Sequence, residues 1–277
     1  MKDLSNENII HVKKNDMEYI QFRRLLEYKN LVHCYTLSAN NFDVAGNDTM
    51  EDKKKTVIDN YNKLANALQI DVNSIIRPYQ THTTNVEEVK NVPQKIDIFE
   101  NYKDIDGLIT NLNNVALSLG YADCTPIFLY DYNKDVIGNT HSGWKGTLGC
   151  IAKCAIEKMK NVYNSNPQDI IACIGPCIKK CHFEVKDDVY EMFFNKFNYT
   201  KRICDIIEKT SNGTYKIDTT LINKLLLLEA GLKEENIIDS NICTACNCDI
   251  MHSYRMRGDS AGRNTAIISY RSQEAIV

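Results

Sequence analysis

Residues 115–142 constrain the fold of this chain most, because their pattern predicts three consecutive strands. Large apolar residues alternate with small ones at Val115, Leu117, Leu119 and Tyr121, which is the period of a strand with one closely packed face. Residues 127–132 and 136–140 then flank Asn133 and Lys134, as in a β-hairpin. A turn centred on these two residues sets His141 opposite Pro126.

The remaining segments mix helices and strands irregularly. Apolar spacing predicts helices over 50–69, 148–162, 187–197 and 218–230, with Thr147 as N-cap of the second, and strands over 170–174, 237–242 and 265–270. Because no regular βαβ alternation appears, the expected fold class is α+β: a single-domain layered α/β sandwich with mixed β-sheets. The domain spans 1–277, with 1–30 as an N-terminal extension or edge elements. Neither G-x-G-x-x-G nor G-x-x-x-x-G-K-[ST] occurs, so dinucleotide and P-loop sites lack support.

Composition excludes further classes of function. The formal net charge is −3, from 33 basic and 36 acidic residues, which gives no reason to expect nucleic acid or an anionic membrane as partner. No apolar run approaches the ~18 residues of a membrane-spanning helix, and the start lacks a hydrophobic signal segment, so we expect a cytoplasmic protein. There the 11 cysteines are expected to be reduced thiols serving as core residues, metal ligands or nucleophiles.

One group of residues suggests metal chemistry. Cys124 lies two residues before Pro126, so the hairpin register places it diagonally across from His141, with the two backbones roughly 7–8 Å apart. His82 follows an apparent strand and is a third candidate. A catalytic zinc ion typically takes three protein ligands and leaves one position open, which His82, Cys124 and His141 would satisfy. Taken singly, each histidine is more readily explained as hydrogen-bonded structure, and Cys124 as a small buried apolar residue.

His141 begins the segment HSGWKG, whose glycines allow a tight turn before a helix. Gly143 and Lys145 are therefore candidates for binding an anion such as phosphate, through free backbone N–H groups and a point charge.

Several blocks together resemble the bacterial laccase-domain family, formerly called multicopper polyphenol oxidases. They are QTH, ADCTPIFLYD, GNTHSGWKG, IGPCIKKCHFEV and ICTACN followed by HSYRMRGDSAGR, in order over about residues 57–270. The family's members are understood as purine nucleoside phosphorylases with adenosine deaminase activity, acting on adenosine, inosine, guanosine and S-methyl-5′-thioadenosine. The resemblance implies a layered α/β sandwich with metal ligands at His82, Cys124 and His141. It implies zinc as the cofactor, and copper could take the same site. The expected substrates are purine nucleosides and phosphate, and the protein is expected to be a monomer or homodimer.

The chain departs from the family pattern at three places. Ser38 stands where the family has an arginine, Thr83 where it has the glycine after the first metal histidine, and Lys145 where it has an arginine after the tryptophan. Ser38 removes a possible anion contact, and a lysine keeps the charge of an arginine without its bidentate geometry.

Other residues have two interpretations each. Cys177, Cys181, Cys243, Cys246 and Cys248 either supply the thiolates of a second, structural zinc or, as the resemblance favours, are present without a metal. Tyr254, Arg255, Arg257 and Arg263 form either a solvated loop or a substrate-binding patch, in which Arg255 best reaches phosphate or ribose. Asp123 is either a catalytic residue that orients a ligand or accepts a proton, or a turn carboxylate.

Two other functions are compatible with these residues, and a third is disfavoured by them. A metal-free Cys–His hydrolase or amidase would use Cys124 as nucleophile, with a pKa lowered by His141. A true multicopper oxidase is disfavoured, because the chain has 6 histidines and no H-x-H pair. A noncatalytic binding module would leave nucleosides unchanged.

Overall fold

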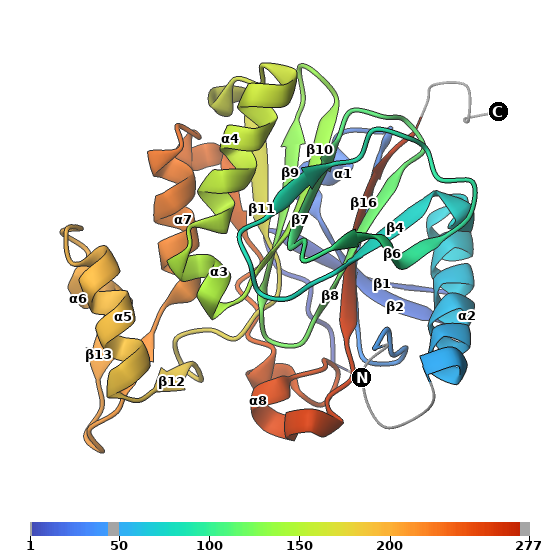
Figure 1. Cartoon of the computed structure of the whole chain (residues 1–277). Helices are drawn as coiled ribbons and strands as arrows, with labels where there is room; N and C mark the ends of the chain where they lie inside the picture. The colour runs from blue at the N-terminus through green and yellow to red at the C-terminus, as the bar shows by residue number, and fades with distance from the viewer. Residues whose placement is uncertain (1, 44–49, 272–277) are drawn as a thin grey trace.

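Two β-sheets pack face to face, and helices cover both outer faces (Figure 1). The computed structural model describes residues 2–43 and 50–271. The seven-stranded sheet has the order β1 (Ile9–Lys14), β2 (Met17–Phe22), β3 (Leu31–Thr36), β16 (Asn264–Tyr270), β8 (Ala116–Tyr121), β4 (Ile75–Tyr79), β6 (Asp97–Lys103). The six-stranded sheet has the order β15 (Ile237–Asp239), β11 (Ile170–Ile174), β9 (Thr125–Asp131), β10 (Val136–Ser142), β7 (Gly107–Thr110), β5 (Val86–Glu88). Both sheets contain parallel and antiparallel pairs, as the expected mixed sandwich requires.

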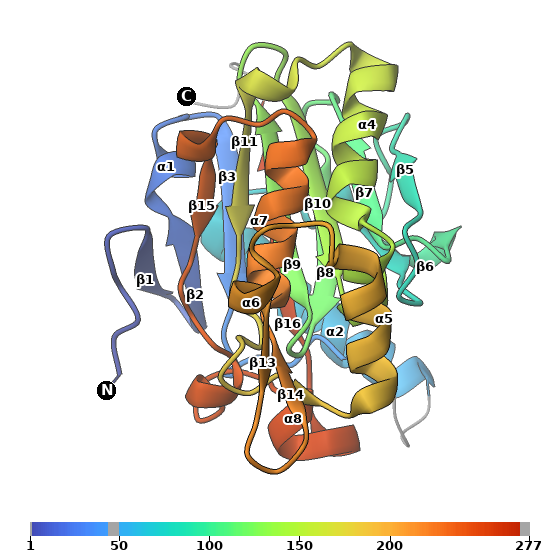
Figure 2. The same cartoon turned by 90° about the vertical axis from the view of Figure 1, so that its left-hand side faces the viewer.

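The helices are divided between the two outer faces. On the seven-stranded sheet lies α2 (Met50–Leu68), whereas α4 (Ile151–Tyr163) and α7 (Thr219–Glu229) cover the six-stranded sheet (Figures 1 and 2). A small sheet of β12 (Glu184–Val185), β14 (Tyr215–Ile217) and β13 (Ile207–Lys209) lies beside α5 (Asp187–Phe197) and α6 (Ile203–Ile206) (Figure 2). The other short helices are α1 (Arg23–Leu26), α3 (Trp144–Leu148) and α8 (Tyr254–Arg257).

The core forms on both faces of the central strands. In β9, Phe128 and Tyr130 point into the core between the sheets, whereas Ile127 and Leu129 point into the core under the helices. Burial of each such side chain contributes about 1.5–3 kcal/mol. Because both faces are covered, every residue of β8, β9 and β10 is buried, including the small residues that alternate along β8.

The hairpin prediction is confirmed. β9 and β10 pair antiparallel with His141 opposite Pro126, and the connection spans residues 132–135. The predicted helices at 50–69, 187–197 and 218–230 are α2, α5 and α7; Asp218 caps α7 by accepting a hydrogen bond from the Leu221 N–H.

The single helix predicted over 148–162, with Thr147 as its N-cap, is wrong. The chain forms two helices, α3 and α4, separated by Gly149 and by Cys150 at φ 64°. Gly149 packs against Thr84, so closely that a Cβ would lie 2.3 Å from the Thr84 methyl carbon. Thr147 lies inside α3, whose N-cap is Gly143. The strand expected over 237–242 is shorter, Ile237–Asp239.

No helix in the described part of the chain is both long and apolar enough to cross a membrane.

Candidate functional site

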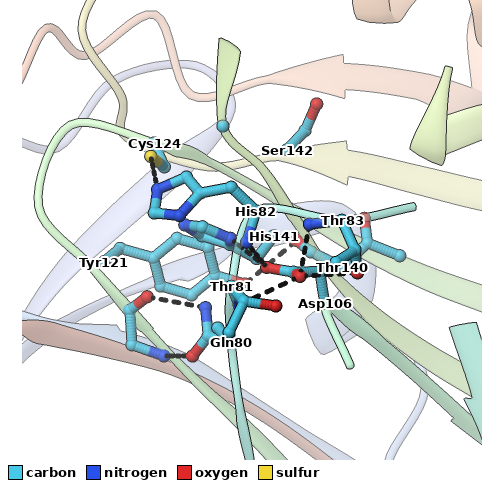
Figure 3. A network of polar contacts seen from close by, with 12 residues as sticks. Gln80, Thr81, His82, Thr83, Asp106, Tyr121, Cys124, Thr140, His141 and Ser142 are labelled. Atoms are coloured by element: carbon cyan, nitrogen blue, oxygen red, sulfur yellow. Dashed lines mark hydrogen bonds and ion pairs between the residues drawn. The ribbon is translucent and has the colours of Figure 1, made fainter. Parts of the chain in front are cut away.

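His82, Cys124 and His141 converge at the ends of three strands (Figure 3). His82 lies in the segment between β4 and β5, Cys124 lies between β8 and β9, and His141 is in β10. Their ligand atoms lie within 4.8 Å of one another, and the Cys124 Sγ is 3.8 Å from the His82 Nε2. The diagonal placement expected from the hairpin register therefore brings the three side chains together.

Asp106, which sequence reasoning missed, holds the ring of His141. The Asp106 Oδ1 lies 2.8 Å from the His141 Nδ1, so the other ring nitrogen, Nε2, is left for a ligand. Asp106 is fully buried and immediately precedes β7. Because Gly107 pairs with Thr140, Asp106 comes opposite His141, and the two residues are also joined by a backbone hydrogen bond. A carboxylate behind a histidine fixes the tautomer and orientation of a metal-ligand imidazole.

The same carboxylate also organises the segment that carries His82. The backbone N–H groups of Thr81, His82 and Thr83 donate to Asp106 at 3.2, 3.1 and 2.7 Å, and the Thr83 hydroxyl donates at 2.8 Å (Figure 3). His82 adopts φ 64°, a left-handed conformation that costs roughly 1–2 kcal/mol for a residue with a Cβ. The hydrogen bonds to Asp106 offset that cost. Thr83, where the family pattern has glycine, supplies two of them, and the one from its hydroxyl is a bond that glycine could not make.

The charges of this cluster are strongly coupled. Burial alone would raise the pKa of Cys124, but the charge of His141 and hydrogen bonds from both histidines outweigh it and lower the pKa to about 6. Burial alone would lower the pKa of His141, but the Cys124 charge and the Asp106 hydrogen bond raise it to about 9. Burial alone would raise the pKa of Asp106, but the hydrogen bond and charge of His141 and the hydrogen bonds from Thr83 outweigh it and lower the pKa. The cluster thus favours a thiolate, which is the form that binds metals.

The residues present fit a zinc ion. Imidazole nitrogen and thiolate sulfur are the donors that zinc prefers, and Gly143 leaves room for them. A Cβ at Gly143 would lie 2.7 Å from the His82 Cδ2 and 3.1 Å from the Cys124 Sγ. Gly143, predicted to bind phosphate, therefore lies against two of the candidate ligands.

A cavity of about 610 Å³ borders the cluster, a size typical of small-molecule sites. His82, Cys124 and His141 all line it. Its walls include three arginines, Arg77, Arg255 and Arg263, and five aromatic residues, Tyr79, Phe99, Trp144, Phe183 and Tyr254. The cavity thus combines candidate metal ligands, cations and flat apolar rings.

Arg77 is a second residue that sequence reasoning missed. It is buried in β4, and its Nη1 donates to the Phe42 carbonyl at 2.5 Å. The small residue Gly120 on the neighbouring strand makes room for its guanidinium, because a Cβ there would lie 2.3 Å from the Arg77 Nη2. Within residues 2–43 and 50–271, the Arg77 Nε has no hydrogen-bond partner. A buried guanidinium with an unused donor at a cavity wall is suited to an anionic ligand.

Some of the basic residues that the sequence predicted to bind substrate line the cavity, and others do not. Arg255 lines the cavity, and its Nη1 donates to the His182 carbonyl at 2.6 Å. Lys145 is exposed, with its ammonium 5.6 Å from the centre of the Trp144 ring, and is not among the cavity-lining residues. Arg257 donates to the Cys248 carbonyl and does not line the cavity either.

Asp123 joins two loops at the cavity wall. Its Oδ1 accepts from the Thr244 hydroxyl at 2.5 Å, and its Oδ2 accepts from the Arg255 N–H at 2.6 Å. Asp123 also lines the cavity, so its catalytic role stays a prediction, while the contact to the His141 ring comes from Asp106.

A second cluster of possible ligands lies beside the cavity. It contains Cys181, His182, Cys243 and Cys246. The set expected from the sequence was partly wrong, because it included Cys177 and Cys248 and omitted His182. The Cys177 sulfur instead lies 3.4 Å from the Thr220 hydroxyl.

Comparisons with known proteins agree with this architecture. The model of a family described as multi-copper polyphenol oxidoreductase laccase matches residues 36–271. The chain is 31% identical over 226 residues to purine nucleoside phosphorylase YlmD of Bacillus subtilis, covering 80% of each protein. It is also 31% identical over 224 residues to adenosine deaminase RL5 from an unknown prokaryotic organism, covering 80% of this chain and 82% of the relative. The crystal structure of a Bacillus licheniformis hypothetical protein, YfiH, superposes with a TM-score of 0.81 at 26% identity, covering 94% of this chain and 98% of the other.

Proposed function

This chain belongs to the multi-copper polyphenol oxidoreductase laccase family, and on that premise we propose that it is a zinc-dependent purine nucleoside phosphorylase that also deaminates adenosine. Its substrates would be adenosine, inosine, guanosine and S-methyl-5′-thioadenosine, with phosphate as the second substrate of phosphorolysis. Two relatives with about 31% identity are named for these two activities.

One observation carries the proposal: the His82, Cys124 and His141 cluster borders a cavity of nucleoside size. Two imidazoles and one thiolate leave one tetrahedral position for a ligand from the cavity side. A multicopper oxidase would need many more histidines, and the described part of the chain has only two metal-ligand clusters of this kind. Copper would compete for the same nitrogen and sulfur donors.

When bound, zinc supplies a positive charge that lowers the pKa of water and polarises substrate oxygens. The protein's own part is to hold that charge in place. His82, Cys124 and His141 would bind the ion, and Asp106, 2.8 Å from the His141 Nδ1, would keep a proton on that nitrogen and leave Nε2 for the ion.

The cavity walls offer groups for each part of the substrate. Phe183 and Tyr254 present rings on which a purine can stack. Arg77 and Arg263 both line the cavity and both bond to Phe42: the Arg77 Nη1 donates to the Phe42 carbonyl, and the Phe42 N–H donates to the Arg263 carbonyl. Together with Arg255 they would bind phosphate and orient it toward the ribose C1′, from which the purine leaves. In deamination, water would instead add to the purine C6, and the 6-amino group would leave as ammonia to give inosine.

Chromatography of nucleosides tests this function. Zinc-loaded protein should release free base from adenosine, inosine and S-methyl-5′-thioadenosine only when phosphate is present, and should convert adenosine to inosine without it. Cys124→Ala should lose both turnover and the metal ion held by His82, Cys124 and His141, whereas Cys204→Ser, which removes an exposed thiol elsewhere, should retain both. Unchanged nucleosides in every reaction would reject the proposal.

A second candidate function has specific support. Cys124, His141 and Asp106 are arranged as nucleophile, base and orienting carboxylate, and the pKa of Cys124 is lowered to about 6. A Cys–His hydrolase of this kind needs no metal. Inactivation by a thiol alkylator at a rate that zinc does not change, with full activity in chelator, would favour it over the phosphorylase.

A further inference from the structure

A group of four soft ligands joins two loops beside the cavity. Cys181 and His182 lie just before β12, while Cys243 and Cys246 form a C-x-x-C turn after β15. The two pairs are about 60 residues apart in sequence, as the 62-residue separation of Cys181 and Cys243 shows. None of these residues is among the lining of the cavity. The cluster is therefore separate from His82, Cys124 and His141.

The distances within this cluster match the edges of a zinc tetrahedron. With Zn–S bonds of ~2.3 Å and Zn–N bonds of ~2.05 Å, tetrahedral geometry requires about 3.8 Å between two sulfurs and about 3.6 Å between sulfur and nitrogen. The Cys181 Sγ is 3.6 Å from the Cys243 Sγ and 3.7 Å from the Cys246 Sγ. The His182 Nδ1 lies 3.2, 3.8 and 3.4 Å from the sulfurs of Cys181, Cys243 and Cys246.

The surroundings also suit a metal-bound thiolate. The backbone N–H of Lys179 points to the Cys243 sulfur at a distance of 3.5 Å, and such donors stabilise negative charge on sulfur. The Cys243 side chain is buried, whereas Cys181 and Cys246 are exposed. Four donors aimed at one point leave no open position for a substrate, which is the arrangement of a structural site.

We propose that Cys181, His182, Cys243 and Cys246 bind a second, structural zinc ion. This ion would join the loop of residues 177–183 to the loop of residues 243–248. Both loops shape the cavity: Phe183 lines it, and the His182 carbonyl accepts a hydrogen bond from Arg255. Thr244 contacts Asp123 from the other loop. The ion therefore fixes the cavity wall that carries Arg255, without taking part in the reaction.

Zinc content per chain tests this site on intact protein. We expect about two zinc ions in the wild-type protein, one for each tetrahedral cluster. The double variant Cys181→Ser/Cys246→Ser should lose one of them. Both side chains are exposed, so the exchange leaves the core intact. The matched control Cys204→Ser/Cys248→Ser removes two thiols outside the cluster and should retain both ions.

The Cys124→Ala variant separates this inference from the proposed function. It should lose one ion and keep the other. The wild-type protein could instead hold a single ion, lost in Cys181→Ser/Cys246→Ser and retained in Cys124→Ala. That result would support the structural site and reject the catalytic metal. If Cys181→Ser/Cys246→Ser holds as much zinc as the wild-type protein, the structural site is overturned.

Alkylation of the wild-type protein gives a second test that needs no variant. With zinc bound, Cys181 and Cys246 should react slowly with iodoacetamide, and a chelator should speed their labelling, as read by peptide mass spectrometry. Cys204 is exposed and lies outside the cluster, so its labelling rate should be the same with and without the chelator. Equal rates for Cys181 and Cys246 with and without chelator would overturn the proposal.

Discussion

At the scale of single residues, Asp106 has the largest influence on the site. It is fully buried, contacts the His141 ring and accepts the N–H groups of the segment that carries His82. Asp106→Asn keeps the shape but removes the charge that fixes the His141 tautomer. We expect zinc affinity to fall roughly 10- to 100-fold, measured by competition with a chelator. The control is Asp104→Asn, a carboxylate that accepts from the Thr81 hydroxyl in the same region; an equal loss in both variants would contradict the specific role of Asp106.

Gly143 provides the second test at this scale. Its backbone, at φ −67° and ψ 173°, suits any residue, so an added methyl group acts only through contact. Because the Cβ would lie 2.7 Å from the His82 ring, Gly143→Ala should displace His82 and greatly reduce bound zinc while the protein remains folded. Gly146→Ala, whose Cβ meets nothing nearer than 3.4 Å, should bind zinc normally. Full zinc content in Gly143→Ala, by elemental analysis, would show that the two candidate ligands do not need this space.

Zinc binding should depend on pH in a defined direction. In the metal-free protein the pKa of His141 is raised to about 9 and that of Cys124 is lowered to about 6. Near neutral pH, zinc must therefore displace a proton from His141 but not from Cys124. As the pH falls from 9 to 6, the logarithm of the association constant should decrease by about one per pH unit, and more steeply below 6 as Cys124 also takes up a proton. Chelator competition across this range measures the slope, and a constant affinity would contradict the assigned protonation states.

At the scale of elements, Asn139 connects the two sheets. From β10 its amide donates to the Leu117 carbonyl of β8 at 3.1 Å and to the Ala266 carbonyl of β16 at 3.0 Å. Its own oxygen accepts from the Tyr121 hydroxyl at 3.1 Å. Asn139→Ala leaves these buried groups short of a partner, so we expect the free energy of unfolding to fall by about 2–4 kcal/mol.

Urea unfolding followed by circular dichroism measures this effect. The control Asn101→Ala removes an exposed amide that bonds to Asp97 in the edge strand β6, and should cost less than about 1 kcal/mol. Equal midpoints for Asn139→Ala and the wild-type protein would show that these bonds do not hold the sheets together.

The elements that the sequence predicted are those set by local patterns. The hairpin register follows from a short turn between alternating residues, so the approach of Cys124 to His141 was predictable. The break at Cys150 was not, because it depends on the packing of Gly149 against Thr84, 65 positions earlier. Asp106 was missed for the same reason. It reaches His141 through the pairing of β7 with β10, across 35 residues.

At the scale of the whole molecule, the cavity depends on contributions from both sheets. Arg77 comes from the seven-stranded sheet, His141 from the six-stranded sheet and Arg255 from α8. No local motif marks Arg77 as a cavity residue, because its place depends on how the sheets stack and on the space above Gly120. The second cluster shows the same limit: the sequence indicated its thiols, but only the folded loops bring His182 to them.

The most direct test of the central claim is an anomalous difference map, measured at the zinc absorption edge from crystals of the zinc-loaded protein. We expect a peak at bonding distance, ~2.0–2.3 Å, from a ring nitrogen of His82, the Cys124 Sγ and the His141 Nε2, with its fourth position facing the cavity. A fully active protein whose map shows no peak between these three side chains would contradict it.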